Sequence, residues 1–257
     1  VTVSWFNNLS SVVSDAEIVV KLSGTAYDKT LVQPGSGYFR SATDDILWNQ
    51  QTTPGLVSLG AGESGSVSFN VTPQDFGISG RPVVNPTLLF SASVSGKRTQ
   101  ETGVASSLTA IMDRIDKIET DVSLSGRVVR TVGPFANIGP IPPKAEQKTT
   151  YTIVWTIDNT TNTVNNAQVT AKLPPYVKWT GQTSPSTEDI SINQDSGLIT
   201  WNAGTVGTYT ANSGTRKEVN FQVSMEPNVN QIGSIPTLIS DATLTGIDTF
   251  TGSDIGS

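Results

Sequence analysis

The side chains able to do chemistry in this chain of 257 residues are its acids, lysines and tryptophans, because it contains no His and no Cys. Histidine is the commonest general base, and His and Cys are common transition-metal ligands. Their absence removes the serine-hydrolase, zinc-hydrolase and cysteine-protease classes and excludes disulfides. We therefore expect no enzyme, no catalytic residues and no bound cofactor.

Acidic residues offer one alternative, a calcium site at a domain junction. Asp44 and Asp45 are adjacent, and Asp241, Asp248 and Asp254 lie near the C-terminal end. Hard cations such as Ca²⁺ favour clustered oxygen ligands. No segment matches an EF-hand loop, and Asp is also a common turn residue. We interpret these residues as turn formers, with calcium binding as the alternative and the metal site unassigned.

The remaining acidic residues do not indicate a glycoside hydrolase. That chemistry needs two carboxylates roughly 5 to 10 Å apart in a cleft. Glu63, Glu188 and Asp189 are expected in loops without such a partner. A Lys-to-Asn or Lys-to-Asp isopeptide cross-link is conceivable at Lys21 and Lys172, but both are predicted on the outward face of a strand, whereas that reaction needs a desolvated amine.

Tryptophans and asparagines give two further hypotheses. Exposed Trp5, Trp155 or Trp179 could bind carbohydrate, whereas Trp48 and Trp201 are expected to be core anchors. Three triplets fit the N-glycosylation pattern and begin at Asn8, Asn70 and Asn159. Equivalent turn geometry is the simpler explanation for Asn8 and Asn159.

The overall charge and hydropathy restrict the partners. A net charge of −6 leaves no basic face for a nucleic-acid backbone, so this charge disfavours nucleic-acid binding and we expect no nucleic-acid partner. No apolar run reaches the roughly 18 residues of a membrane span, so we expect no direct membrane insertion by this segment. The chain opens at Val1 inside an apparent strand, and we expect it to be part of a longer, anchored protein.

An internal repeat organises the chain. Four well-matched blocks recur in the same order, at offsets that drift only between 150 and 153 residues. The matched pairs are Ala16–Leu22 with Ala167–Leu173, Ile46–Asn49 with Ile199–Asn202, Val67–Val71 with Val219–Val223, and Pro86–Leu88 with Pro236–Leu238. Phe6 falls over Ile157 in this alignment, while Val1, Val3 and Trp5 are one residue out of register, which a bulge would reconcile.

The matched blocks alternate apolar and polar residues, as strands with one buried face do. Short strands separated by Gly, Pro, Asn and Asp predict two tandem immunoglobulin-like Greek-key β-sandwiches. The first is assigned to residues 1–104 and is expected to lack an N-terminal strand. The second is assigned to residues 121–257.

Residues 105–120 are predicted to connect the sandwiches as a short helix. Leu108, Ile111, Met112, Ile115 and Ile118 have helical spacing, and Ser106 or Ser107 could cap it. We expect this helix to pack against its own chain, with a partner-binding helix as the alternative.

Three segments of the second copy resemble a known family. They are Tyr-Thr-Ile-Val-Trp-Thr-Ile-Asp-Asn-Thr-Thr-Asn at 151–162, Asn-Ala-Gln-Val-Thr-Ala-Lys-Leu-Pro-Pro-Tyr-Val-Lys-Trp at 166–179, and Ile-Thr-Trp-Asn at 199–202. With Gly197 and Trp201 as a Gly-x-x-x-Trp motif, this pattern resembles the conserved-repeat domain of unknown function of bacterial and archaeal surface proteins. The first copy diverges, with Ser23-Gly24 in place of Pro174-Pro175.

The resemblance implies an immunoglobulin-like sandwich, export, and a role as a spacer or adhesive stalk without catalytic residues. We therefore expect an extracellular, cell-surface segment whose partners are neighbouring repeats of the parent chain. A carbohydrate- or protein-binding module that uses exposed loops or aromatics is the alternative.

Overall fold

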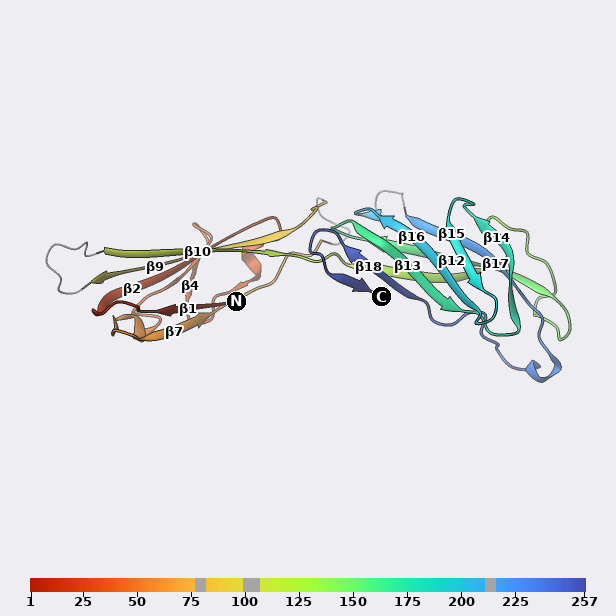
Figure 1. The fold of residues 1–257 in the computed structure, drawn as a ribbon, viewed down its shortest axis with the longest axis horizontal. Coiled ribbons are helices and arrows are strands. Elements are labelled where there is room, and N and C mark those ends of the chain that lie inside the picture. The colour runs from red at the N-terminus through yellow and green to blue at the C-terminus, as the bar shows by residue number, and fades with distance from the viewer. Residues whose placement is uncertain (77–81, 99–106, 211–215) are drawn as a thin grey trace. The chain divides into compact units, whose positions relative to one another are not determined.

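The computed structural model describes residues 1–76, 82–98, 107–210 and 216–257, and throughout these ranges the protein is built from antiparallel β-strands. The chain divides into two compact units (Figure 1). The first unit contains Val1–Phe76 and Asn85–Ile118, and the second contains Gly77–Val84 and Glu119–Ser257. The predicted all-β, immunoglobulin-like sandwich class is confirmed.

The first unit has a large sheet in the order β10-β9-β2-β5-β4, with β6 also paired to β2. Opposite it stand the pair β1-β7 and the short pair β3-β8. The strands are β1 (Thr2–Phe6), β2 (Val13–Ser23), β3 (Val32–Gln33), β4 (Tyr38–Arg40), β5 (Asp45–Trp48), β6 (Ser58–Leu59), β7 (Ser64–Ser68), β8 (Asn70–Val71), β9 (Thr87–Arg98) and β10 (Ser107–Lys117), with 3-10 turns at Lys29–Leu31 and Pro54–Leu56.

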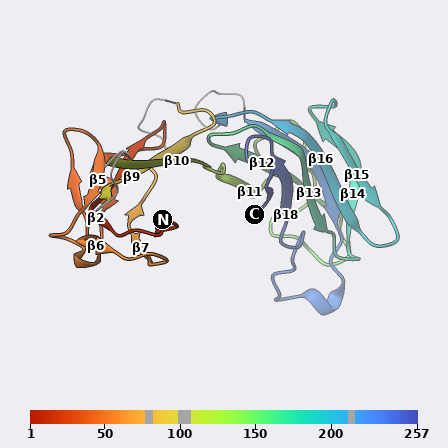
Figure 2. The ribbon, with the colours of Figure 1, turned by 60° about the vertical axis from the view of Figure 1, so that its left-hand side comes forward.

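The second unit has two complete sheets, β11-β12-β17-β14 and β15-β16-β13-β18-β19. Figure 2 shows β15, β16, β13 and β18 side by side in that order. The strands are β11 (Val122–Val129), β12 (Thr149–Asn159), β13 (Val164–Lys172), β14 (Val177–Ser184), β15 (Asp189–Asn193), β16 (Leu198–Val206), β17 (Lys217–Met225), β18 (Thr243–Asp248) and β19 (Asp254–Gly256), with a 3-10 turn at Val229–Gln231.

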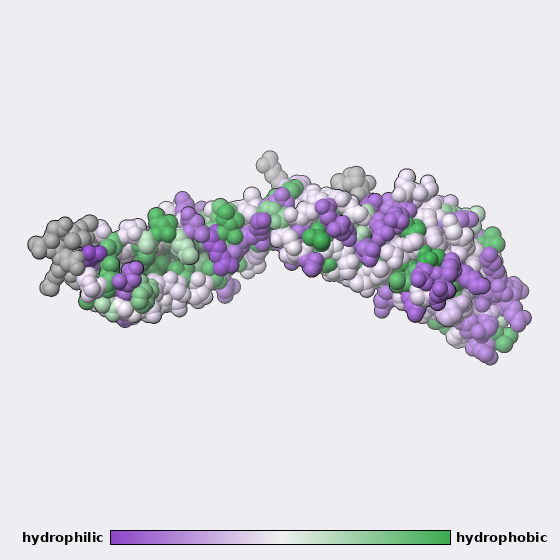
Figure 3. All heavy atoms as spheres, viewed as in Figure 1, coloured by the Kyte–Doolittle hydropathy of each residue, from purple (hydrophilic) through white to green (hydrophobic). Residues whose placement is uncertain are grey.

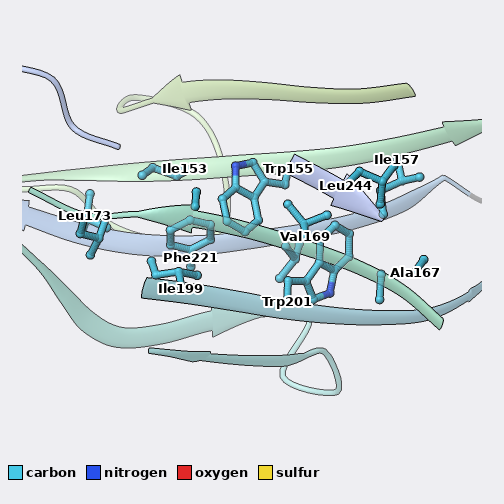
Figure 4. Close-up of a cluster of buried hydrophobic side chains, with 14 of the residues drawn as sticks. Ile153, Trp155, Ile157, Ala167, Val169, Leu173, Ile199, Trp201, Phe221 and Leu244 are labelled. Atoms are coloured by element: carbon cyan, nitrogen blue, oxygen red, sulfur yellow. The ribbon is translucent and has the colours of Figure 1, made fainter. Parts of the chain in front are cut away.

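Each unit has its own core, because alternate side chains of facing strands point between the sheets. In the second unit the Trp155 and Phe221 rings meet edge to face, with their centroids 4.9 Å apart (Figure 4). In the first, Phe69 packs between Trp48 and Phe90. Trp48 and Trp201 are both fully buried, so their prediction as core anchors is confirmed.

The predicted helical connector is wrong. Residues 107–117 form strand β10, which pairs with β9 along its whole length, and the proposed cap Ser106 lies outside the described residues. The apolar residues that suggested a helical face are divided between the two faces of this edge strand, and Ile111, Met112 and Ile115 are all exposed. Long-range hydrogen bonding to β9 outweighs the local 3.6-residue pattern, which cannot report such a partner.

The two units share the same irregularity. The pairing of β2 with β9 shifts between Ser14 and Glu17, and that of β13 with β18 shifts between Asn165 and Gln168. Each shift contains one left-handed residue, Asp15 with φ 49° and Asn166 with φ 53°. An added Cβ on Gly96 or Gly246, the glycine opposite each shift, would lie 2.6 or 2.7 Å from a Val Cγ1.

The register problem at the first strand is resolved without a bulge there. Val3 lies opposite Val67 in β1-β7, and Trp155 lies opposite Val219 in β12-β17, so Trp155 corresponds to Val3. Trp5, rather than Phe6, therefore corresponds to Ile157. Six residues separate Phe6 from Val13, whereas five separate its counterpart Asp158 from Val164, so the connection is one residue longer in the first unit.

Truncating the equivalent core phenylalanines should identify two independent cores. We expect Phe221→Ala to lower the free energy of unfolding of the second unit by about 3–5 kcal/mol, and Phe69→Ala to lower that of the first by a similar amount. Denaturant unfolding followed by hydrogen exchange in each unit measures both. If either variant destabilised both units equally, the cores would not be independent.

Candidate functional site

The first pair of predicted calcium ligands is engaged within the protein. Arg40 Nε donates to Asp45 Oδ1 at 2.5 Å, and Asp45 is buried. The Tyr27 hydroxyl donates to Asp44 Oδ1 at 3.0 Å, and burial together with this bond raises the Tyr27 pKa. Asp44 has φ 53°, the left-handed conformation of a turn. Asp44 therefore fits its prediction as a turn former, whereas Asp45 does not, because it is the first residue of strand β5.

Asp248 is the most buried acid of the predicted set. Its Oδ2 accepts from the Thr120 amide at 2.9 Å and from Asn162 Nδ2 at 2.7 Å. Its Oδ1 accepts from the amides of Phe250 at 2.8 Å and Thr251 at 3.1 Å. Burial opposes ionisation, but these four donated bonds outweigh it and hold the pKa of the Asp248 carboxyl below its usual value.

Further buried polar groups surround this carboxylate, and together Thr120, Asn159, Asn162 and Asp248 are named the Asp248 cluster. The Thr120 hydroxyl donates to Asn159 Oδ1 at 2.7 Å and accepts from the amide of Asn162 at 3.2 Å. Asn159 Nδ2 donates to the carbonyls of Asn162 at 2.7 Å and Gly207 at 2.8 Å. The cluster ties the segment that leads into β11 to the ends of β12 and β18.

The Asp248 cluster has the features of a hydrogen-bond network that stabilises the fold. All four of its members are buried, and both carboxylate oxygens already accept two hydrogen bonds each. Asp241 and Asp254 are exposed. Across the described ranges, no group of three or more acids, His or Cys could hold a metal ion.

Carbohydrate binding by Trp5, Trp155 or Trp179 would require exposed rings, and the structure exposes little of these three side chains. Trp155 is buried in the core, and Trp5 and Trp179 are partly buried against their cores. Trp179 Nε1 donates to the carbonyl of Gln182 at 3.3 Å. The three rings therefore form no exposed aromatic platform.

The remaining acids take structural hydrogen bonds. Glu188 accepts from Trp201 Nε1 at 2.8 Å and from Lys217 Nζ at 2.9 Å. Glu63 accepts from the Gly60 amide at 2.7 Å in a loop, as predicted. Asp189 begins strand β15 rather than lying in a loop, and it accepts from Asn202 Nδ2 at 2.8 Å.

Solvent exposure bears on two further hypotheses, isopeptide formation at the lysines and N-glycosylation at the asparagines. Lys21 and Lys172 are exposed, which disfavours isopeptide chemistry at either amine. Asn8 and Asn70 are exposed, whereas Asn159 is buried with its amide engaged. The structural counterpart of Asn159 is Asn7, whose Nδ2 donates to Ser11, Leu59 and Gly60 carbonyls, so pairing Asn159 with Asn8 is wrong by one residue.

Sequence reasoning missed Thr120 and Asn162 as partners of Asp248. They lie 128 and 86 residues from it in the chain, and no short-range pattern links such positions. The available signal is a run of small polar residues, Asn159-Thr-Thr-Asn162, between two apolar strands. Such a run at a sandwich end predicts internal side-chain capping.

No helix in the described residues is long and apolar enough to cross a membrane. No protein-family model and no curated protein sequence matches the chain. The resemblance to the conserved-repeat domain of surface proteins therefore stays a prediction.

Solved structures give weak similarities. The chitin-binding domain of a chitinase from Pyrococcus furiosus aligns at 14% identity over 53% of this chain and 99% of its own, with a TM-score of 0.27. BcpA, the major pilin subunit of Bacillus cereus, aligns at 8% identity over 100% of this chain and 66% of its own, with a TM-score of 0.30.

The full-length major pilin SpaD from Corynebacterium diphtheriae aligns at 10% identity over 95% of this chain and 57% of its own, with a TM-score of 0.33. This chain thus spans less than two thirds of the length of either pilin. TM-scores this low carry no argument about function, and the fold assignment rests on the strand order described above.

Neutralising the central carboxylate should weaken the second unit. We expect Asp248→Asn to lower its free energy of unfolding by about 2–4 kcal/mol at pH 7, because hydrogen bonds to a buried charge are lost. Since the pKa of Asp248 is lower in the folded state, its stabilisation is complete above the unfolded value of about 4 and disappears as pH falls through the folded value.

The loss in free energy of unfolding caused by Asp248→Asn should therefore be large near pH 6 and become smaller below about pH 4. Urea unfolding at a series of pH values measures it, with the exposed Asp254→Asn as the control. A deficit that did not change with pH would show that the charge of Asp248 is not what stabilises the cluster.

Proposed function

We propose that this chain is a non-enzymatic structural segment of a larger bacterial surface protein, in which two sandwich repeats serve as a stalk or spacer outside the cell. The observation that carries the proposal is the use of its buried acid and amide groups. Asp248, Asn159 and Asn162 are consumed in hydrogen bonds that fasten the chain to itself. None of the three is left free for a substrate.

A spacer must resist extension, and the second unit is suited to this. A pull on the chain ahead of Thr120 acts on its amide bond to Asp248 and on the ladder that joins β11 to β12 from Val122 to Val129. Because ladder bonds run perpendicular to their strands, a pull along the axis of β11 loads these bonds together. The Asp248 cluster adds a buried anchor at the end of that ladder.

The repeated architecture also supports a spacer. Both units carry the same bulge, the same close glycine and the same buried side-chain amide, Asn7 after β1 and Asn159 at the end of β12. Duplication of one module accounts for all three. Repetition lengthens a protein without requiring a new fold, which is how arrays of surface modules extend.

A metal-free spacer should not respond to calcium. We expect less than about 1 °C change in melting temperature on millimolar Ca²⁺, because a ligand that does not bind the native state cannot stabilise it. Calorimetry against a chelator-treated sample, together with the maximum dimension from small-angle scattering, measures this. Stabilisation with stiffening would overturn our interpretation of the acidic residues.

Mechanical unfolding tests the spacer role directly. In single-molecule pulling from the chain ends, we expect two discrete unfolding events, one per unit. Asp248→Asn should lower the force of one event and leave the other unchanged, and Asp254→Asn should change neither. Extension without discrete events would contradict a spacer, and retention of a specific glycan on an array would favour the binding-module alternative.

A further inference from the structure

Strand β10 has one unpaired side along its whole length. It pairs with β9 through all of its 11 residues, Ser107–Lys117. β10 is the last strand of its sheet, and among the described residues no strand pairs with its other side. This open side is named the β10 edge. An edge of this length is a template for a further strand, which proteins either protect or use.

The β10 edge does not depend on a strand like β11. Leu108 of β10 lies opposite Gly96 of β9. Ile255 of β19 lies opposite Gly246, the glycine that corresponds to Gly96, so β19 holds the place of β10 in the second unit. There β11 is present, and it pairs with β12 in the other sheet instead of with β19. A strand of that kind ahead of Val1 would therefore lie beside β1 and leave the β10 edge open.

The odd-numbered residues of β10 direct their backbone groups to this edge. Along an antiparallel strand, the amide and carbonyl of successive residues point alternately to one side and to the other. The Ile118 amide, directly after the strand, donates to the Pro86 carbonyl at 2.9 Å, in register with the β9 ladder. The even-numbered residues therefore face β9, and Asp113 and Ile115 present their amides and carbonyls at the β10 edge.

The charges at the C-terminal end of β10 complement their own reverse order. The segment Asp113-Arg114-Ile115-Asp116-Lys117 reads negative, positive, apolar, negative, positive. If two copies run antiparallel with Ile115 at the centre, Asp113 faces Lys117 of the other copy, and Arg114 faces Asp116 of the other copy. Opposite charges that face each other stabilise an antiparallel pair. Centring the pair on any other residue of the segment would place a charge opposite its own copy.

The side chains that would meet are accessible. Ile115 is 62% exposed, and Asp113 and Lys117 are exposed beside it on the same face of the sheet. On the other face, Arg114 Nε donates to Asp116 Oδ1 at 2.7 Å within the strand. Two copies would bring these two pairs together as alternating charges. Figure 3 shows hydrophobic residues beside hydrophilic ones on the part of the first unit that β10 crosses in Figure 1.

We propose that the β10 edge is a self-association surface, through which two copies of this chain pair antiparallel about a two-fold axis at Ile115. The backbone of Asp113 and Ile115 supplies main-chain hydrogen bonds, and the charges set the register and orientation. Each copy contributes the same residues, as a two-fold interface requires. So short a contact gives a weak dimer that salt dissociates. This role goes beyond a spacer, because it joins one chain to another.

Concentration and salt test the association on the whole chain. By sedimentation velocity, we expect dimer to increase between about 10 µM and about 1 mM protein, the range of a small interface. It should decrease at about 0.5 M NaCl, because salt screens exposed ion pairs. Hydrogen exchange at the Asp113 and Ile115 amides should slow as dimer forms. A chain that stays monomeric at about 1 mM would overturn the proposal and assign the charges to protection of the edge.

Charge reversal tests the pairing itself. Asp113→Lys alone or Lys117→Asp alone places like charges opposite each other, and each should weaken dimerisation roughly tenfold. The double variant should dimerise as the original chain does, and the two single variants should form mixed dimers with each other. Asp254→Lys makes the same change in net charge elsewhere and should have little effect. A double variant no better than the single ones would contradict the proposed pairing.

Cross-linking tests the register, because the chain has no Cys of its own. Ile115→Cys lies on the two-fold axis and should give covalent dimers with a short bifunctional maleimide. Ile111→Cys lies on the same face but about 26 Å from its own copy, at about 3.3 Å per residue, and should give few. Circular dichroism checks that both variants are folded. Equal cross-linking of the two, or cross-linking of Ile111→Cys alone, would overturn the two-fold axis at Ile115.

Discussion

The structure depends on one constraint. Each buried backbone amide of a β-sandwich needs a hydrogen-bond partner, and each inward side chain needs other side chains to pack against. Alternation with a period of two sends half of the side chains between the sheets, and the ladder hydrogen bonds satisfy the backbone. The second unit meets this constraint with two facing sheets, β11-β12-β17-β14 and β15-β16-β13-β18-β19, whose inward side chains form one core. The first unit meets it with the sheet β10-β9-β2-β5-β4 and the pairs β1-β7 and β3-β8, which enclose a second core.

At the ends of the sandwich the same constraint falls on polar groups. Strands stop there, and their last amides lose their ladder partners. In the second unit the carboxylate of Asp248 and the amide of Asn159 replace those partners from within the fold. A buried charge is tolerated there because four donors surround it.

The sequence by itself determined the all-β class and most of the core, because these follow from local alternation. The buried positions of Trp48 and Trp201 and the outward lysines 21 and 172 were all predicted from that pattern. The absence of His and Cys likewise restricts the chemistry that the chain can perform, whatever its fold. These inferences needed only neighbours a few residues apart.

Only the tertiary structure decided what depends on distant partners. The helical spacing from Leu108 to Ile118 described a strand, because pairing with β9 fixes the backbone and local spacing does not encode that partner. The sequence pattern predicted Asp248 as a turn former or a calcium ligand. The tertiary structure shows that its carboxylate accepts hydrogen bonds from Thr120 and Asn162. Hydrogen-bond partners across a sheet are set by the fold as a whole.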